Sequence, residues 1–170
     1  MKHLKFVYAI IFGIVLFVFS ISYAYGEEKA SALEIVKKVR EAAAFLSEAG
    51  EPGIAEFQKR ESPWVWKDTY IFIHDCQKGT TIAHPIKPGH IGKNNIGIKD
   101  VKGNMFFVQG CEAAKDPKGG WIEYWWPKPG EKKPSRKISY MYRIPDMNLD
   151  IGAGVYDDTL SIEELKKLLD

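Results

Sequence analysis

Hydrophobic positions with a helical period form the first clear pattern in the chain. Between residues 31 and 49 they recur every three or four positions, and charged residues fill most of the others. Ser31 and Glu34 have the spacing of a capping box, and the run Gly50–Gly53 ends the pattern. We therefore expect a long amphipathic helix whose buried stripe contains Leu33, Ile35, Val36, Val39, Ala43 and Leu46.

Beyond this helix, the pattern changes to short runs of β-branched and aromatic residues separated by turn-forming residues. These runs predict strands at 69–74, 80–84, 121–126, 136–144 and 149–156. Strands joined mainly by hairpins, after one long helix, indicate an α+β fold with an antiparallel sheet of about five to six strands.

Three shorter helices and one long loop complete the prediction. We expect helices over residues 54–60 and 104–115, and a tail helix that starts after Ser161, where Glu164 completes a second capping box. The segment 88–103 is rich in glycine and asparagine and is typical of a loop. No internal repeat divides the chain, so residues 27–170 are expected to form one domain.

The first 26 residues have the composition of an export segment. Lys2 and Lys5 precede an uncharged run over residues 6–25, which closes with the small residues Ser22, Ala24 and Gly26. This pattern fits a cleaved signal peptide, and it also fits a membrane anchor that is retained. Because both positive charges precede the apolar run, either form places the rest of the chain outside the cytoplasm, in the periplasm or secreted.

Charge and motifs exclude several classes of function. The chain has 24 Lys and Arg against 22 Asp and Glu, and the whole surplus comes from the two lysines of the export segment. A neutral body gives no general electrostatic reason to bind nucleic acid. The sequence contains no nucleophile elbow, zinc-protease motif, phosphate loop or dinucleotide fingerprint. We therefore expect neither an enzyme nor a cofactor.

The histidines of the predicted sheet do not have metal-site spacing. His74, His84 and His90, together with Asp75 and Asp100, match no standard pattern of metal ligands. A structural role for these side chains is favoured, and no metal is expected. His84 ends a predicted strand beside the long loop, and for this reason we keep it as a possible pocket residue.

The two cysteines are expected to form a disulfide. Cys76 and Cys111 are the only pair, and an exported chain meets oxidising conditions. A bridge across this separation would stabilise the fold by about 4 kcal/mol in the chain-entropy model. Two unpaired thiols, a catalytic cysteine and a metal site are the alternatives, but no nucleophile signature or zinc spacing supports the last two.

Aromatic residues are concentrated on two adjacent predicted strands. Strand alternation places Tyr124 and Trp126 on one face of the sheet and Trp121 and Trp125 on the other. One face should meet the long helix, and the other should be covered by the loop or form a ligand site. Arg136 and Lys137 are neighbours in one predicted strand, so one of them points to each face of the sheet. A cation surrounded by aromatic side chains suits a small carboxylate ligand. The alternative is a filled aromatic core in a structural or protein-interaction domain that binds no ligand.

Seven segments in order make the chain resemble a single Cache domain, the extracytoplasmic sensor module of bacterial chemoreceptors and sensor kinases. They are Asp68–Ile73, Gly79–Pro85, Ile91–Asn94, Lys99–Asn104, Gly119–Pro127, Lys137–Tyr140 and Ile151–Tyr156. The resemblance implies a long helix packed on a PAS-like antiparallel sheet, with a small-molecule pocket on the other face. Members of this type typically bind short carboxylates such as acetate, propionate, pyruvate or lactate.

Pocket residues follow from the same resemblance. Lys137 would be the charge partner of a carboxylate and Trp126 an apolar wall, and the remaining candidates are Tyr124, Tyr140, His84 and, less directly, Tyr70. Lys137 and Tyr140 are three positions apart, so strict alternation places them on opposite faces unless the strand contains a bulge.

The chain also differs from a receptor at its C-terminal end. No second membrane span or signalling domain comes after the tail helix before Asp170. From this we expect a stand-alone ligand-binding protein, free or tethered by residues 6–25, that works with a membrane receptor or sensor kinase as its partner.

Overall fold

The fold is that of a computed structural model, which describes residues 28–170. The predicted export segment at residues 1–26 lies outside the described residues. Between residues 28 and 170, no helix combines the length and the apolar composition that a membrane span requires.

The first helix of this region is α2 (Ala32–Ala49), and its start is the predicted capping box. The Ser31 hydroxyl accepts a hydrogen bond from the backbone N–H of Glu34, and the Glu34 carboxylate accepts one from the backbone N–H of Ser31. One position of the predicted stripe is wrong: Leu33 is 64% exposed. Because each residue turns an α-helix by about 100°, Leu33 lies well away from Ile35 around the helix, and Ala32 takes its place in the buried stripe.

A 3-10 helix, η1 (Glu51–Gln58), follows α2 and replaces the helix predicted over residues 54–60. Its Phe57 is fully buried, and its ring lies 6.0 Å from the ring of Phe45 and 4.9 Å from that of Trp64. These three aromatic rings close one end of the layer between α2 and the sheet.

A five-stranded antiparallel sheet forms the centre of the domain. Its strands run in the order β4-β3-β7-β6-β5, which places the last strand of the chain in the middle. They are β3 (Phe72–Asp75), β4 (Thr80–Ala83), β5 (Gly120–Pro127), β6 (Pro134–Arg143) and β7 (Asp150–Val155). The predicted α+β fold with a long first helix and a sheet of this size is confirmed.

The predicted strand over residues 69–74 is divided in two. A small separate ribbon pairs β1 (Val65–Trp66) with β2 (Thr69–Tyr70), and the main sheet begins at Phe72. Tyr70 pairs with Val65, whereas Phe72 pairs with Gly152 of β7. The chain therefore changes its pairing partner at Ile71, a change that the pattern of side chains does not reveal.

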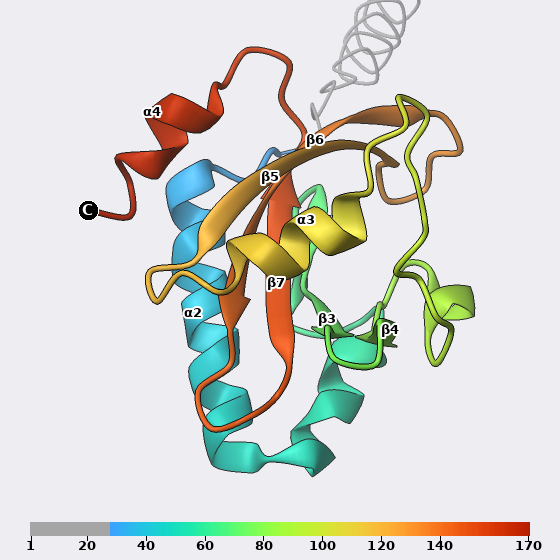
Figure 1. Cartoon of the computed structure of the whole chain (residues 1–170), viewed down its shortest axis with the longest axis vertical. Helices are drawn as coiled ribbons and strands as arrows, with labels where there is room; N and C mark the ends of the chain where they lie inside the picture. The colour runs from blue at the N-terminus through green and yellow to red at the C-terminus, as the bar shows by residue number, and fades with distance from the viewer. Residues whose placement is uncertain (1–27) are drawn as a thin grey trace, which may run out of the picture.

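Different elements cover the two faces of the sheet (Figure 1). Helix α2 packs on β6 and β7 from one side, whereas α3 (Phe106–Ala113) packs on β5 and β6. The segment between β4 and α3 includes the short 3-10 helix η2 (Pro88–His90) and also lies on the α3 side, where Ile91 bridges to Thr81. We call the two sides of the sheet the α2 face and the cavity face.

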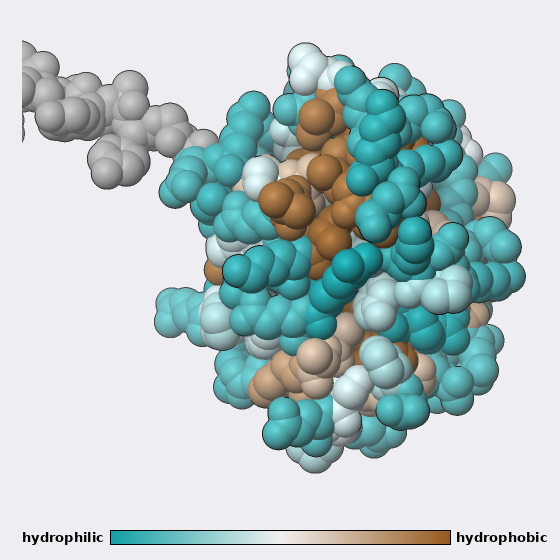
Figure 2. All heavy atoms as spheres, turned by 90° about the vertical axis from the view of Figure 1, so that its left-hand side faces the viewer, coloured by the Kyte–Doolittle hydropathy of each residue, from teal (hydrophilic) through white to brown (hydrophobic). Residues whose placement is uncertain are grey.

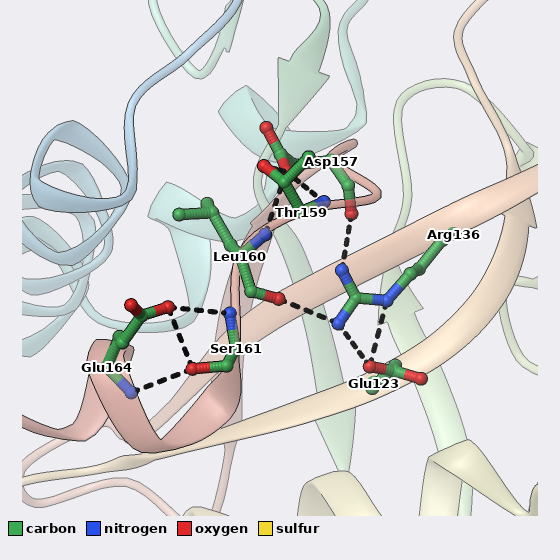
Figure 3. Close-up of polar contacts among 7 residues, drawn as sticks. All are labelled: Glu123, Arg136, Asp157, Thr159, Leu160, Ser161 and Glu164. Carbon is green, nitrogen blue, oxygen red and sulfur yellow. Dashed lines mark hydrogen bonds and ion pairs between the residues drawn. The ribbon is translucent and has the colours of Figure 1, made fainter.

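Hydrogen bonds from Arg136 of β6 hold the segment after β7 against the α2 face (Figure 3). The Arg136 guanidinium donates two hydrogen bonds to the Glu123 carboxylate and one each to the backbone carbonyls of Asp157 and Leu160. The short helix α4 (Ile162–Lys166) then starts at the predicted second capping box, in which the Ser161 hydroxyl accepts from the backbone N–H of Glu164.

Figure 2 views the side of the molecule that carries α2 and α4. This side is mostly hydrophilic, as expected of the outer surface of an amphipathic helix, but hydrophobic patches interrupt it, the more strongly coloured one in the upper half of the view. Leu33 near the start of α2 and Leu168 after α4 are among the exposed hydrophobic residues of the domain.

A disulfide joins the sheet to α3. Cys76 directly follows β3 and Cys111 lies within α3, and their Cα atoms are 5.7 Å apart. The structure thus contains the cysteine pair that the sequence suggests, and residues 28–170 contain no free thiol. The bridge holds α3 against the cavity face.

Candidate functional site

A small cavity lies on the cavity face, between the sheet, α3 and the long loop. Its volume is about 30 Å³. Its wall is mainly aromatic and contains a few polar side chains; its residues are Tyr70, Phe72, His74, Thr81, His84, His90, Asn95, Ile98, Phe106, Phe107, Ile122, Tyr124, Trp126 and Met141. No acidic residue of the described region lines it.

Strand β5 contributes alternate residues to this wall. Ile122, Tyr124 and Trp126 face the cavity, whereas Trp121 belongs to the core beneath α2. The predicted division of the aromatic residues between the two faces is therefore confirmed. The ring of Tyr124 stacks on Phe106 of α3 at 4.7 Å, and its hydroxyl lies 3.0 Å from that of Ser139 on β6. This contact holds the Tyr124 ring in place.

Lys137 of β6 is directly opposite Tyr124 and points to the same face. The residue is fully buried, and its ammonium nitrogen has no hydrogen-bond partner among residues 28–170. It lies 4.1 Å from the ring centroid of Tyr70, 5.3 Å from that of Phe72 and 5.2 Å from that of Tyr156. Lys137 does not itself line the cavity but lies behind the rings of Tyr70 and Phe72.

The environment of Lys137 disfavours its positive charge. Burial lowers the pKa of Lys137 to about 7, although the nearby Asp68 carboxylate acts in the opposite direction. The three aromatic faces around the ammonium group supply the remaining attraction. No carboxylate of the described residues is hydrogen-bonded to this nitrogen, so a bound anion could pair with it directly.

The structure settles which of two neighbouring cations faces the cavity. Arg136 pairs with Trp125 across the strands and points to the α2 face, where it holds Glu123. Tyr140, which the resemblance suggested as a pocket residue, also belongs to the α2 face. Its hydroxyl donates to the backbone carbonyl of Lys118 and accepts from Arg40. Strands β5 and β6 pair residue by residue without a bulge, so Tyr140 and Lys137 stay on opposite faces.

His84 is placed where it can donate a hydrogen bond. Its Nδ1 accepts from the backbone N–H of Lys87 at 3.0 Å, so the neutral ring carries its proton on Nε2. Burial, together with the positive charge of Lys137, lowers the pKa of His84 well below its ordinary value. The ring lies 4.8 Å from that of Tyr70. At neutral pH the side chain is thus an uncharged donor beside the cavity.

Two further polar atoms on this face lack partners. The Tyr70 hydroxyl and His74 Nδ1 are buried and have no hydrogen-bond partner among the described residues, as is also true of Lys137 Nζ. Burial lowers the pKa of His74 to about 3, and the charges of His90 and Lys137 add to the effect. An unpaired buried polar group costs about 1–3 kcal/mol. Three such groups around one cavity are therefore a concentration of unused hydrogen-bonding capacity.

Of the six predicted ligand residues, four line the cavity and one adjoins it. Tyr70, His84, Tyr124 and Trp126 line it, and Lys137 lies behind its wall. Sequence reasoning missed Phe72 and His74, although both alternate with Tyr70 along the chain. The residues from α3 and the loop, such as Phe106 and Asn95, carry no pattern that points to a pocket. Their place depends on how these segments fold over the sheet.

The loop that covers the cavity is held by a small polar network. The Asn95 amide donates to the Thr81 hydroxyl at 2.9 Å and to the backbone carbonyl of His90 at 3.2 Å. Farther along, Asp100 accepts from the backbone N–H groups of Asn104 and Trp125. The loop is therefore tied to β4 at one end and to β5 at the other.

Two glycines in the middle of the sheet allow the close packing beneath the cavity. A Cβ atom at Gly152 of β7 would lie 2.9 Å from the ring of Phe72, and one at Gly154 would overlap the Ser139 hydroxyl. Neither position therefore accepts a larger side chain unless the packing around it shifts.

The histidines around the cavity do not form a metal site. Among residues 28–170, the only group with metal-ligand geometry contains Cys76, Cys111 and Asp150. The two sulfur atoms are bonded to each other, so they offer no thiolate to a metal ion.

Comparison with known proteins identifies the fold. The family model described as Cache domain matches residues 61–161. The chain belongs to the Cache domain family. The predicted resemblance is thereby confirmed. Cache domains are sensor domains of chemoreceptors and are not a class of enzymes.

One curated protein is similar to this chain over part of its length. Over 103 residues, the Cache domain is 32% identical to the methyl-accepting chemotaxis protein McpP of Pseudomonas putida strain KT2440. The match covers 61% of this chain and 19% of that protein. The chain therefore spans about a fifth of the length of this relative.

Solved structures have the same architecture. A methyl-accepting chemotaxis protein from Vibrio parahaemolyticus RIMD 2210633 superposes with a TM-score of 0.61 at 22% identity, over 74% of this chain and 87% of that one. A structure described as "Structural basis for carboxylic acid recognition by a Cache chemosensory domain" has a TM-score of 0.57 at 27% identity, over 72% and 86% of the two chains.

Proposed function

We propose that this Cache domain binds a short organic acid in the cavity between the sheet and the long loop. The observation that carries the proposal is the set of three buried polar atoms on this face that have no hydrogen-bond partner among residues 28–170, one of which is the ammonium nitrogen of Lys137. A similar Cache domain recognises carboxylic acids, which supports the same ligand class here.

The chemistry of the wall favours an anion. A carboxylate has only hydrogen-bond acceptors, and the Tyr70 hydroxyl and His84 Nε2–H are donors beside the cavity. The wall carries no acid within the described region, and Lys137 adds positive charge behind Tyr70. The rings of Phe106 and Trp126 can surround an alkyl group. A ligand with its carboxylate group next to Tyr70 and its carbon chain between these rings would meet the hydrogen-bond donors with its charged end and the aromatic rings with its apolar end.

The size of the cavity favours a very small acid. A cavity needs about 10–15 Å³ to hold one water, so 30 Å³ corresponds to about two water-sized groups. Acetate is the smallest of the four expected acids and is closest to this size. Propionate, pyruvate, lactate and any longer acid require the loop or the Tyr70 ring to move outward.

The proposal includes the place and partner of the domain. The export segment predicts that residues 27–170 act outside the cytoplasm, free or tethered by residues 6–25. A membrane receptor or sensor kinase is the partner we infer, because the relatives of this domain are chemoreceptors.

Thermal unfolding of the purified protein with acetate, propionate, pyruvate and lactate tests the proposal. A ligand at 100 times its Kd stabilises the fold by about 2.7 kcal/mol, so we expect the midpoint to rise by several degrees. The matching amides, acetamide and propionamide, have nearly the same shape without the charge and should cause no shift. The Lys137→Met variant should lose the shift, whereas Lys132→Met, which changes an exposed hairpin lysine, should keep it.

The alternative is a domain whose aromatic face is filled core and binds no ligand, and the small volume of the cavity favours it. No shift with any acid, from protein that unfolds cooperatively, would support this alternative. An equal shift with acids and amides would contradict the role of charge but not that of the cavity.

A further inference from the structure

A buried carboxylate lies directly against the disulfide. Asp150 is the first residue of β7 and is fully buried. One of its carboxylate oxygens and the sulfur atoms of Cys76 and Cys111 all lie within 4.8 Å of one another. Arg143 donates a hydrogen bond to Oδ1, while Oδ2 has no partner among residues 28–170.

The neighbours of Asp150 make it a group that can hold a proton. Burial raises the pKa of the Asp150 carboxyl, the Arg143 guanidinium opposes this effect, and Asp75 adds to it. Asp150 pairs with His74 of β3 across the strands. From α3, the other charged groups near the disulfide are the paired side chains of Glu112 and Lys115.

The disulfide can be reached from outside. Cys76 and Cys111 are both partly exposed. They lie in the wall of a surface hollow of about 380 Å³, whose other residues are Gln77, Ile96, Val108, Glu112, Lys115 and Arg143. The two cations of this hollow are each paired with a carboxylate, Lys115 with Glu112 and Arg143 with Asp150.

We propose that the Cys76–Cys111 disulfide is a redox-reactive site, at which a small external thiol exchanges with the bridge and Asp150 transfers the proton. The thiolate of the small molecule attacks one cysteine sulfur, a mixed disulfide forms, and the S–S bond of the bridge breaks. The other cysteine leaves as a thiolate and takes a proton from Asp150. A second thiolate then attacks the mixed disulfide, and the second cysteine leaves as a thiolate that takes its proton from the solvent, which also returns a proton to Asp150. Two thiols are thus oxidised to their disulfide and the bridge is reduced to two thiols. In reoxidation, Asp150 accepts the proton of the attacking cysteine.

The position of the bridge connects this reaction to the cavity. Cys76 follows β3, which carries His74, and Cys111 is one turn of α3 beyond Phe107. The rings of His74 and Phe107 stack at 4.4 Å, and both line the cavity. Reduction would release the covalent link between these two walls.

The rate of reduction of the folded protein by 2-mercaptoethanol tests the proposal. The released cysteines are alkylated and counted by mass spectrometry, over a range that runs from pH 8 down to the ordinary pKa of an aspartic acid, about 4. Because burial raises the pKa of the Asp150 carboxyl above that ordinary value, the rate constant, expressed per thiolate of the reagent, should rise as the pH falls through this range. The Asp150→Asn variant should react at least about tenfold more slowly at the acidic end of the range. The control Glu112→Gln removes an exposed carboxylate from the same hollow and should react within about twofold of the unaltered protein.

Two results would overturn the proposal. One is a rate per thiolate that does not change with pH in the unaltered protein, a measurement that holds even when Asp150→Asn does not fold. The other is a rate that is independent of the thiol concentration and equal to the rate of global unfolding. Either outcome would make the bridge a purely structural link.

Discussion

The two faces of the sheet are built from similar hydrophobic residues but differ in how their polar groups are satisfied. On the α2 face, Tyr140 and Arg136 have partners for their side-chain hydrogen bonds, and the buried atoms without a partner among residues 28–170 are the indole nitrogens of Trp66 and Trp121. On the cavity face, the corresponding atoms around the cavity are an ammonium nitrogen, a hydroxyl and an imidazole nitrogen, from Lys137, Tyr70 and His74. Leaving such groups unpaired costs free energy that a ligand can recover, and the cost is greatest for a charged group. The face that holds the unpaired ammonium group is therefore the candidate site.

The largest expected effect comes from the α2 face and should not concern the ligand. Leu46 of α2 is fully buried in the core between helix and sheet. Leu46→Ala should lower the free energy of unfolding by about 2–5 kcal/mol, because it leaves a cavity in packed surroundings. Urea denaturation measures the loss. The affinity for a carboxylate, measured by calorimetry on the folded variant, should stay within about twofold, and a large drop would contradict the separation of the two faces.

A change at Lys137 should raise the free energy of unfolding of the ligand-free protein, whereas the change at Leu46 lowers it. Lys137→Met removes a buried, unpaired ammonium group and should stabilise the free domain by about 1–3 kcal/mol at pH 6. The folded pKa is about 7 and the ordinary value is 10.5. The unfolded chain therefore holds more protons between these values, and the stability of the unaltered protein should rise with pH across that window.

The advantage of Lys137→Met should thus be complete below pH 7 and shrink toward pH 10, as urea denaturation at several pH values can show. Lys132→Met, an exposed change of the same type, should alter the stability by less than about 0.5 kcal/mol at any pH. A Lys137→Met protein that is less stable than its parent at pH 6 would show that the ammonium group is well satisfied in the fold.

The smallest expected effects come from removing the hydroxyl group of one tyrosine on each face of the sheet. Tyr140→Phe loses the hydrogen bonds with Lys118 and Arg40 and should cost about 1 kcal/mol of stability without changing ligand affinity. Tyr70→Phe removes a hydroxyl that has no partner within residues 28–170, so the free protein should be no less stable. Its carboxylate affinity should fall about fivefold. The reverse result for the two variants would place the site on the α2 face.

Local patterns in the sequence are sufficient for the elements and for much of the site. The capping boxes at Ser31 and Ser161 start helices where they are expected, because each cap depends only on residues within one turn. Strand alternation divides Tyr124 and Trp126 from Trp121, because the side-chain period of a strand is two. The same rule also places Lys137 and Tyr140 on opposite faces, and the assignment of Tyr140 to the pocket disagrees with it.

Long-range packing accounts for the rest. Alternation says that Arg136 and Lys137 point in opposite directions, but only the position of α2 shows which of them meets the cavity. The break at Ile71, the contributions of α3 and the loop to the wall, and the contact of Asp150 with the disulfide all join residues far apart in the chain. The α+β fold, the family and the β5 part of the aromatic wall can be predicted from the amino-acid sequence, because these features depend on local periods and motifs. Which polar atoms are left without partners emerges only when the chain is folded, because that depends on the groups that every neighbouring segment places beside them.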